Sequence, residues 1–525
     1  MSRAPGGLRL RRLGVAVVAL VTSLAPVVGC GDGADLSSTS QSTATPTQIP
    51  TPTPTQVRGD SVPSPDIEGP VTGGSGAPFI ASTTFDLAQV GYSEAEYFIS
   101  GTATAYTNVG SLTADGEWTV TTGDIAAYKT RILVYRPSDR TKFNGTVLVE
   151  WLNVSGGLDA APDWLSAHTE LIREGCAWVG VSAQYVGVEG GSSILGLPVT
   201  PLKMADPERY GSLVHPGDSF SYDIFSQAAQ AIRRPAAGIS PVGDLKTGTV
   251  IAAGESQSAF RMVTYINAVH PLADIYDGFL VHSRGGNTIA AAPLSEPPEP
   301  SISVPGSAQI RSDLDVPVLT FETETDLTFL SYYSARQADS DRFRLWEVAG
   351  TAHADAYMLA IGSTDLGNSP DAATLVLTSN PVPGITCRTP INSGPQHFVL
   401  NAAIAALIQW VRQGTPPPHA PLLDVTGTKI VRDAHGNALG GIRTPQVDVP
   451  IATLSGEGQT GSVLCLLFGT TKPFDAATLA ALYPDHNAYV SAFDNATDGA
   501  VSAGFILPQD AELLKTAAAS SAVGM

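Results

Sequence analysis

One stretch decides the fold of this chain: Thr249-Val250-Ile251-Ala252-Ala253-Gly254-Glu255-Ser256-Gln257-Ser258. Its apolar start is typical of a buried strand, and residues 258–269 after it predict a helix. A serine flanked by small residues suits a tight turn from strand to helix, because bulky neighbours would clash there. Such a turn lifts the hydroxyl clear of the sheet, and the helix N-terminus behind it favours developing negative charge. Ser256 is therefore a candidate nucleophile, and the alternative is an ordinary Gly/Ser connection.

Strand-like and helix-like segments alternate on both sides of this turn. The strand-like segments are 97–103, 128–135, 145–151, 177–182, 249–253, 277–282, 316–321 and 343–348, and the helix-like ones are 164–174, 222–233, 258–269 and 398–411. Continuous apolar strands between helices predict a mostly parallel central sheet with helices on both faces. The first strands have no helix between them, which indicates an antiparallel N-terminal edge. With the serine turn, this pattern favours the α/β-hydrolase fold.

Length and charge narrow the class of protein. The chain has 525 residues, of which 43% are hydrophobic, and this is enough for a large core. Its 29 basic and 49 acidic residues give a formal net charge of −20. Such a surface repels phosphate backbones, so we expect no nucleic-acid partner.

The N-terminus resembles an export signal. Arginines precede an apolar segment from Leu13 to Val28, and Gly29-Cys30 follows as in a bacterial lipobox. We expect a lipoprotein signal peptide over 1–30, lipidation of Cys30, and a location at the cell envelope or outside the cell. The Ser/Thr/Pro-rich composition that follows predicts a disordered tether, which we end at residue 77. The hydrolase domain would cover 78–415, with an irregular C-terminal extension over 416–525 packed on it or covering part of the site.

Three cysteines remain after Cys30. Cys176 lies in an apolar strand and is expected to be a buried free thiol. Cys387 and Cys465 lie in loop-like segments and could form a disulfide, which persists in an exported protein. The chain has no CxxC pair or close His/Cys cluster, so we predict neither a metal nor another cofactor.

A serine nucleophile needs a base, and the base needs an acid to orient it. In α/β-hydrolases these follow in the order Ser, acid, His, each after a successive strand. His353 follows the strand 343–348 across a loop of small residues and is the candidate base. Asp326 follows the strand 316–321 and is the candidate acid, and Glu324 is its rival.

Two further histidines compete for a role in the site. His397 stands at the start of a helix and is expected to be a capping or core residue, although a shifted triad could use it. His282 ends a strand and is expected to line the substrate pocket. Glu255, beside the nucleophile, is a further candidate substrate-binding residue, or simply a carboxylate favoured by the helix N-terminus.

Hydrolysis also requires backbone N–H groups that stabilise an oxyanion. One is expected from Gln257, directly after the nucleophile. The other is expected from the loop after the strand 145–151, where Asn153, Val154 and Ser155 are the candidates.

These segments together resemble a family of exported bacterial proteins known as alpha/beta hydrolase domain-containing proteins. The resemblance runs from about residue 90 to the C-terminus. Its matching stretches are 149–157, 215–218, 254–259, 322–326 and 350–355. The resemblance implies the fold, a serine-hydrolase mechanism, and Ser256 of G-E-S-Q-S as nucleophile, with a serine in place of the usual last glycine.

The expected function is that of an exported serine hydrolase acting on small-molecule carboxylic esters through a covalent acyl-enzyme. An amide or peptide hydrolase could use the same residues. A non-catalytic binding lipoprotein and a remodeller of cell-envelope polymers are two further hypotheses that the sequence leaves open.

Overall fold

The computed structural model describes residues 58–193, 197–236, 238–286, 306–382 and 384–525. The expected signal peptide, lipidated Cys30 and residues 31–57 of the tether lie outside these ranges. Within them, no helix combines the length and hydropathy needed to cross a membrane.

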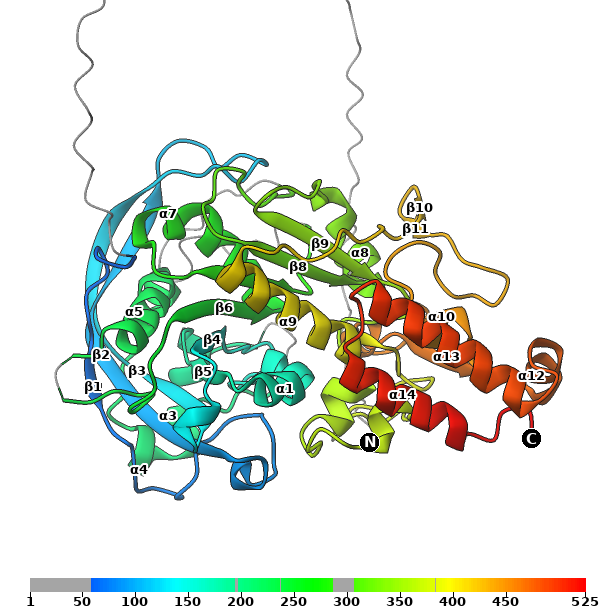
Figure 1. Ribbon diagram of the computed structural model, residues 1–525. Coiled ribbons are helices and arrows are strands. Elements are labelled where there is room, and N and C mark those ends of the chain that lie inside the picture. Colours follow the sequence, from blue (N-terminus) through cyan, green and yellow to red (C-terminus); the bar gives the residue numbers. More distant parts are fainter. Residues whose placement is uncertain (1–57, 194–196, 237, 287–305, 383) are drawn as a thin grey trace, which may run out of the picture. The chain divides into compact units, whose positions relative to one another are not determined.

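A nine-stranded sheet with the order β1-β2-β3-β5-β4-β6-β7-β8-β9 forms the centre of the fold (Figure 1). Three antiparallel pairings join β1 to β2, β2 to β3 and β3 to β5, and all later pairings are parallel. The strands are β1 (Asp66–Glu68), β2 (Tyr92–Asn108), β3 (Val120–Pro137), β4 (Thr146–Trp151), β5 (Ala177–Val181), β6 (Thr249–Glu255), β7 (Gly278–His282), β8 (Val318–Thr323) and β9 (Phe343–Val348). The predicted parallel sheet with an antiparallel N-terminal edge is confirmed.

Helices cover both faces of this sheet. The principal ones are α1 (Pro162–Glu174), α5 (Ser221–Arg233), α6 (Gln257–Thr264), α8 (Glu324–Thr328) and α9 (Gln396–Gln413). Alternate residues of one strand enter different cores, as β6 illustrates. Val250 and Ala252 pack in the core that contains α5 and α6, whereas Ile251 and Ala253 pack against α1 and α9. Burial on both sides explains why the central strands are continuously apolar.

The fold begins earlier than the composition of the chain suggests. β1 pairs with β2, and Val62 is buried in the main core. The Val71 N–H also donates to the backbone oxygen of Glu96 at 2.7 Å. The expected tether boundary at residue 77 is therefore wrong, because a few apolar and strand-forming residues inside a Pro/Gly-rich segment are enough to dock it on a preformed edge.

The C-terminal extension contains small two-stranded sheets and several helices. β12 (Ala452–Ser455) pairs with β13 (Thr470–Pro473), and the four-residue α11 (Val463–Leu466) lies between them. The helices α13 (His486–Ser502) and α14 (Pro508–Ser520) lie side by side (Figure 1). Their apolar residues form a separate core that also includes Phe398 of α9, so the extension packs on the hydrolase body.

Candidate active site

Ser256 lies at the turn between β6 and α6. Its backbone has φ of 56° and ψ of −123°, a conformation that L-residues rarely adopt. The Ser256 N–H donates to the backbone oxygen of His282 at 3.0 Å, which ties the turn to β7. A Cβ on Gly254 would approach backbone atoms of Ser258 to 3.0 Å, so the helix packs closely against the strand end. The small residues of this motif are thus required by the turn.

A continuous chain of hydrogen bonds links the three residues expected at the centre of the site. The Ser256 hydroxyl lies 2.7 Å from Nε2 of His353, and Nδ1 of His353 lies 2.6 Å from Oδ1 of Asp326. Because a carboxylate only accepts, Nδ1 carries the proton and Nε2 is free to accept from the serine. His353 is buried and Ser256 half-buried, so the chain runs from the protein interior to the surface of a cavity.

Asp326 is held in place from its other side. Its Oδ2 accepts from the Thr323 N–H at 2.8 Å and from the Thr323 hydroxyl at 2.7 Å, in a capping box at the start of α8. This leaves Oδ1 for the histidine.

Glu324, the rival acid, belongs to a different set of contacts. Its carboxylate accepts from the N–H groups of Gly350 at 2.7 Å and Gly456 at 3.0 Å, and pairs with Arg432 at 2.9 Å. Burial raises the pKa of Glu324, and Arg432 opposes that shift. The expectation that Glu324 could orient His353 is wrong: it instead fixes the loop that carries His353 to the C-terminal extension.

The loop after β4 offers one uncommitted amide of the three that were expected. The Asn153 N–H donates to the backbone oxygen of Ala160 at 2.9 Å, and the Ser155 N–H donates to Oδ1 of Asn153 at 2.7 Å. Within the described ranges, the N–H groups of Val154 and Gln257 have no hydrogen-bond partner. These two amides are therefore the pair available to stabilise an oxyanion.

Glu255 lies next to the base as well as next to the nucleophile. Its Oε1 is 3.5 Å from Nε2 of His353, and Asn153 donates to its backbone oxygen at 3.1 Å and to its Oε2 at 3.3 Å. Burial raises the pKa of Glu255 well above its usual range, and the negative charges of Asp163 and Asp326 raise it further. Asn153 thus joins the loop after β4 to the turn that carries Ser256.

His282 is not in the pocket, where its place at the end of a strand predicted it. Its side chain is fully buried, with Nδ1 donating to Asp163 at 2.8 Å and Nε2 accepting from Gln396 at 3.1 Å. The residue ends β7, but its ring packs edge-on against Phe321 under the sheet edge. These contacts could not be read from its position along the strand.

His397, the alternative base, lies away from the serine. It is buried in α9, donates from Nδ1 to the backbone oxygen of Ser166 at 2.7 Å, and stacks on Tyr357. Burial lowers its pKa to about 4. It is a core residue, as expected.

A cavity of about 570 Å³ opens over Ser256. Its lining includes Glu255 and His353, but most of it is apolar. The sequence pattern did not predict this lining, which comprises Leu158, Leu165, Met358, Leu359, Val382, Ile385, Leu464, Leu467 and Phe468. Apart from Leu165 in α1, these residues lie in loops or in helices of five residues or fewer, which are too short to show periodicity. The only signal near them was the pair Cys387 and Cys465, which form a disulfide as expected.

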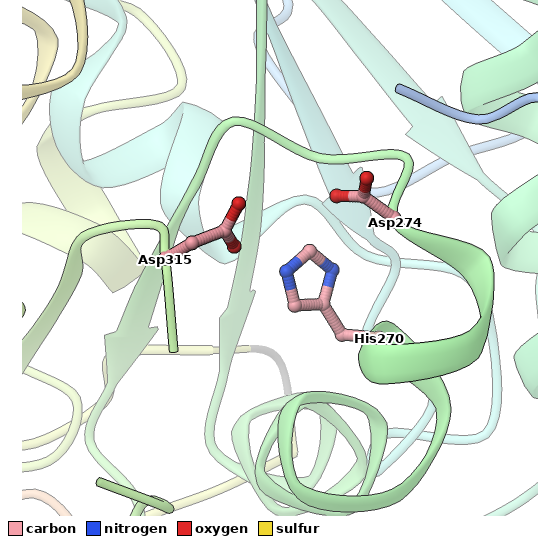
Figure 2. Close-up of side chains that lie close together, drawn as sticks. All are labelled: His270, Asp274 and Asp315. Carbon is pink, nitrogen blue, oxygen red and sulfur yellow. The ribbon is translucent and has the colours of Figure 1, made fainter. Parts of the chain in front are cut away.

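A second group of potential metal ligands lies away from Ser256. It comes from the start of α7 (His270–Ala273), the residue directly after α7, and the loop before β8. His270, Asp274 and Asp315 have potential ligand atoms within 4.8 Å of one another (Figure 2). Burial lowers the pKa of His270 to about 3. The guanidinium of Arg58 forms ion pairs with Asp274 and Asp315, so a positive charge already neutralises these carboxylates. We assign no metal to this group for that reason.

Comparison with known proteins identifies the family. A family model described as "Alpha/beta hydrolase domain" matches residues 67–516. This chain belongs to the alpha/beta hydrolase domain family. The match begins within β1 and ends within α14, so both the antiparallel edge and the C-terminal extension of this alpha/beta hydrolase are parts of the family's domain.

No curated protein matches this alpha/beta hydrolase at a significant level. The solved structures that this chain matches include a fungal esterase from Rhizomucor miehei. The identity is 12%, the match covers 60% of this chain and 85% of that chain, and the TM-score is 0.29. Acetyl xylan esterase 1 from Thermoanaerobacterium sp. JW/SL YS485 has 10% identity, coverages of 55% and 83%, and a TM-score of 0.28. A carboxylesterase from Lactobacillus plantarum WCFS1 has 12% identity, coverages of 42% and 72%, and a TM-score of 0.26. Similarity this low leaves the function to be argued from the site itself.

Proposed function

We propose that this protein is an exported serine hydrolase that cleaves carboxylic esters through a Ser256–His353–Asp326 triad. The single observation that carries the proposal is the hydrogen-bond chain of 2.7 Å and 2.6 Å through His353. A free serine hydroxyl is a weak nucleophile, and this chain supplies both the base and the group that sets its tautomer.

The geometry supports the following steps. His353 Nε2 takes the proton of the Ser256 hydroxyl while Oγ attacks the ester carbonyl carbon. The N–H groups of Gln257 and Val154 stabilise the resulting oxyanion. Collapse of this intermediate breaks the bond to the alcohol, which leaves with the proton from Nε2. Water then attacks the acyl-enzyme with His353 again as base, and the acid is released.

Export and lipid anchoring are the further parts of the proposal. The arginine-rich start, the apolar segment 13–28 and Gly29-Cys30 support them. The disulfide between Cys387 and Cys465 supports an oxidising compartment. Radiolabelled palmitate incorporation that disappears in Cys30→Ser would test the anchor, and unchanged labelling would contradict it.

A fluorophosphonate probe and a p-nitrophenyl butyrate assay test the enzymatic proposal. Wild-type protein should be labelled and active, whereas Ser256→Ala should lose both signals. Ser258→Ala is the matched control, because Ser258 is a fully buried serine two residues away whose hydroxyl has no hydrogen-bond partner within the described ranges. Equal labelling of Ser256→Ala and wild type would refute the assignment, and hydrolysis of the matching anilide at a comparable rate would favour an amidase.

A further inference from the structure

Two loops that are far apart in the sequence form one wall of the cavity over Ser256. This clamped wall consists of Val382, Ile385, Leu464, Leu467 and Phe468. The disulfide joins the two loops directly, since Cys387 lies two residues after Ile385 and Cys465 lies between Leu464 and Leu467.

Apolar packing and several hydrogen bonds also join these loops. The Asn392 N–H donates to the backbone oxygen of Phe468 at 2.8 Å, and the Gln459 side chain donates to the backbone oxygen of Thr389 at 2.7 Å. The segment 379–392 has no helix in its described part, which has a single isolated bridge between Val382 and Ile385. Among the described residues, the hydrogen bonds between the two loops reach the first one only at 389–393, so the disulfide is the link nearest to Val382 and Ile385.

The rest of the apolar lining comprises Leu158, Leu165, Met358 and Leu359. The last three of these belong to the same apolar cluster as Ile385, Leu464, Leu467 and Phe468. Among the described residues that line the cavity, none is lysine or arginine, and the only ionisable ones are Glu255 and His353 at the reaction centre. A substrate that carried a carboxylate or phosphate into this space would lose its hydration without gaining a cationic partner.

The cavity over Ser256 has a volume of about 570 Å³. This is within the range of about 300–1,000 Å³ that is usual for small-molecule sites. An acetyl ester of a small alcohol would leave most of the apolar surface uncovered.

We propose that the substrates are uncharged esters with an apolar chain of several carbons, and that the clamped wall determines the preferred chain length. This inference rests on the proposed ester hydrolysis at Ser256, and it adds the substrate class and the residues that select it. Reduction of the disulfide would release the wall and remove the preference while the reaction centre remains assembled.

Two series of esters test the inference. In p-nitrophenyl alkanoates the acyl chain is lengthened from two to eight carbons, and in alkyl butyrates the alcohol is lengthened over the same range. In one of these series kcat/KM should rise by about fourfold for each added methylene until the cavity is filled. p-Nitrophenyl hemisuccinate should be hydrolysed at least 10-fold less efficiently than p-nitrophenyl butyrate.

Substitutions in the clamped wall then test whether these residues set the chain-length preference. Leu467→Ala and Ile385→Ala should reduce the advantage of hexanoate over acetate by about 10-fold. The double variant Cys387→Ala/Cys465→Ala, and wild type treated with dithiothreitol, should do the same. Leu422→Ala is the matched control, because this exposed leucine does not line the cavity.

The outcomes separate the two proposals. Absence of both fluorophosphonate labelling and acetate hydrolysis would refute the proposed function. Intact acetate hydrolysis with no chain-length gain in either series, or an equal loss for acetate and hexanoate in the Leu467→Ala variant, would overturn the role of the clamped wall.

Discussion

Replacing Asp326 with asparagine tests whether Asp326 must orient the His353 ring for hydrolysis, because the histidine itself is kept. The two oxygens of Asp326 face different partners, with Oδ1 toward Nδ1 of His353 and Oδ2 toward the two donors of Thr323. In Asp326→Asn the amide oxygen is preferred on the Thr323 side, because an NH₂ group there would face two donors. The NH₂ group is then directed at Nδ1 of His353 and forces this nitrogen to accept. The proton moves to Nε2, which can no longer receive the proton of Ser256.

The size of the effect follows from this change of tautomer. Loss of the correct tautomer in a serine triad lowers kcat by about 10⁴-fold, which corresponds to about 5.5 kcal/mol of transition-state stabilisation. The fold should be little affected, because the amide oxygen keeps both hydrogen bonds to Thr323. We expect the free energy of unfolding to change by less than about 1 kcal/mol.

Steady-state hydrolysis of p-nitrophenyl butyrate and the rate of fluorophosphonate labelling measure the effect. Both should fall by about 10³- to 10⁴-fold in Asp326→Asn, with KM nearly unchanged. Glu324→Gln is the matched control: it makes the same chemical change two residues away, where the carboxylate contacts Gly350, Gly456 and Arg432. This variant should lose stability and keep kcat/KM within a few-fold. If Asp326→Asn retains more than a tenth of wild-type activity, the assignment of Asp326 as the orienting acid is refuted.

Two further predictions concern stability. Burial raises the pKa of Asp355 to about 7 from its usual 3.8, and its Oδ2 has no partner within the described ranges. Protonated Asp355 therefore contributes stability that is fully present below about pH 4 and is lost as the pH rises toward 7. Asp355→Asn removes this loss, so it should raise the free energy of unfolding by up to about 4 kcal/mol at pH 8. At pH 4 the same substitution should change it little. Urea unfolding at both pH values measures this difference, and an equal change at both would contradict it. Gly254→Ala places a Cβ 3.0 Å from backbone atoms of Ser258, so it should destabilise the fold by about 1–3 kcal/mol and lower kcat by displacing Ser256. Thermal unfolding with kinetics would show it, and wild-type values of both would argue against a tight turn.

The sequence predicted the elements that depend on local pattern. The strand 249–253 and the helix after it could be recognised because burial on both faces selects apolar residues in β6, and because the tight turn excludes large residues around Ser256. The order serine, acid, histidine along the chain similarly placed Asp326 and His353 after successive parallel strands, whose carboxyl ends share one edge of the sheet.

Only the tertiary structure decided which of several plausible side chains meet. Asp326 and Glu324 are two residues apart and both follow β8, but one turn of α8 directs the first at His353 and the second at Gly350 and Arg432. His282 was expected in the pocket and instead contacts Asp163 of α1, a partner 119 residues away.

The lining of the cavity was even less predictable from the sequence than these side-chain contacts. Its clamped wall is built from a loop and from a second segment that contains the short helix α11, and the disulfide joins them across a sequence separation of 78 residues. The periodicity of apolar residues in a segment indicates which of its side chains are buried. It does not indicate which distant loop packs beside that segment. The volume and apolar character of the cavity over Ser256 therefore emerge only when the chain has folded, although the candidate nucleophile beneath it can be recognised from the short stretch of sequence around it.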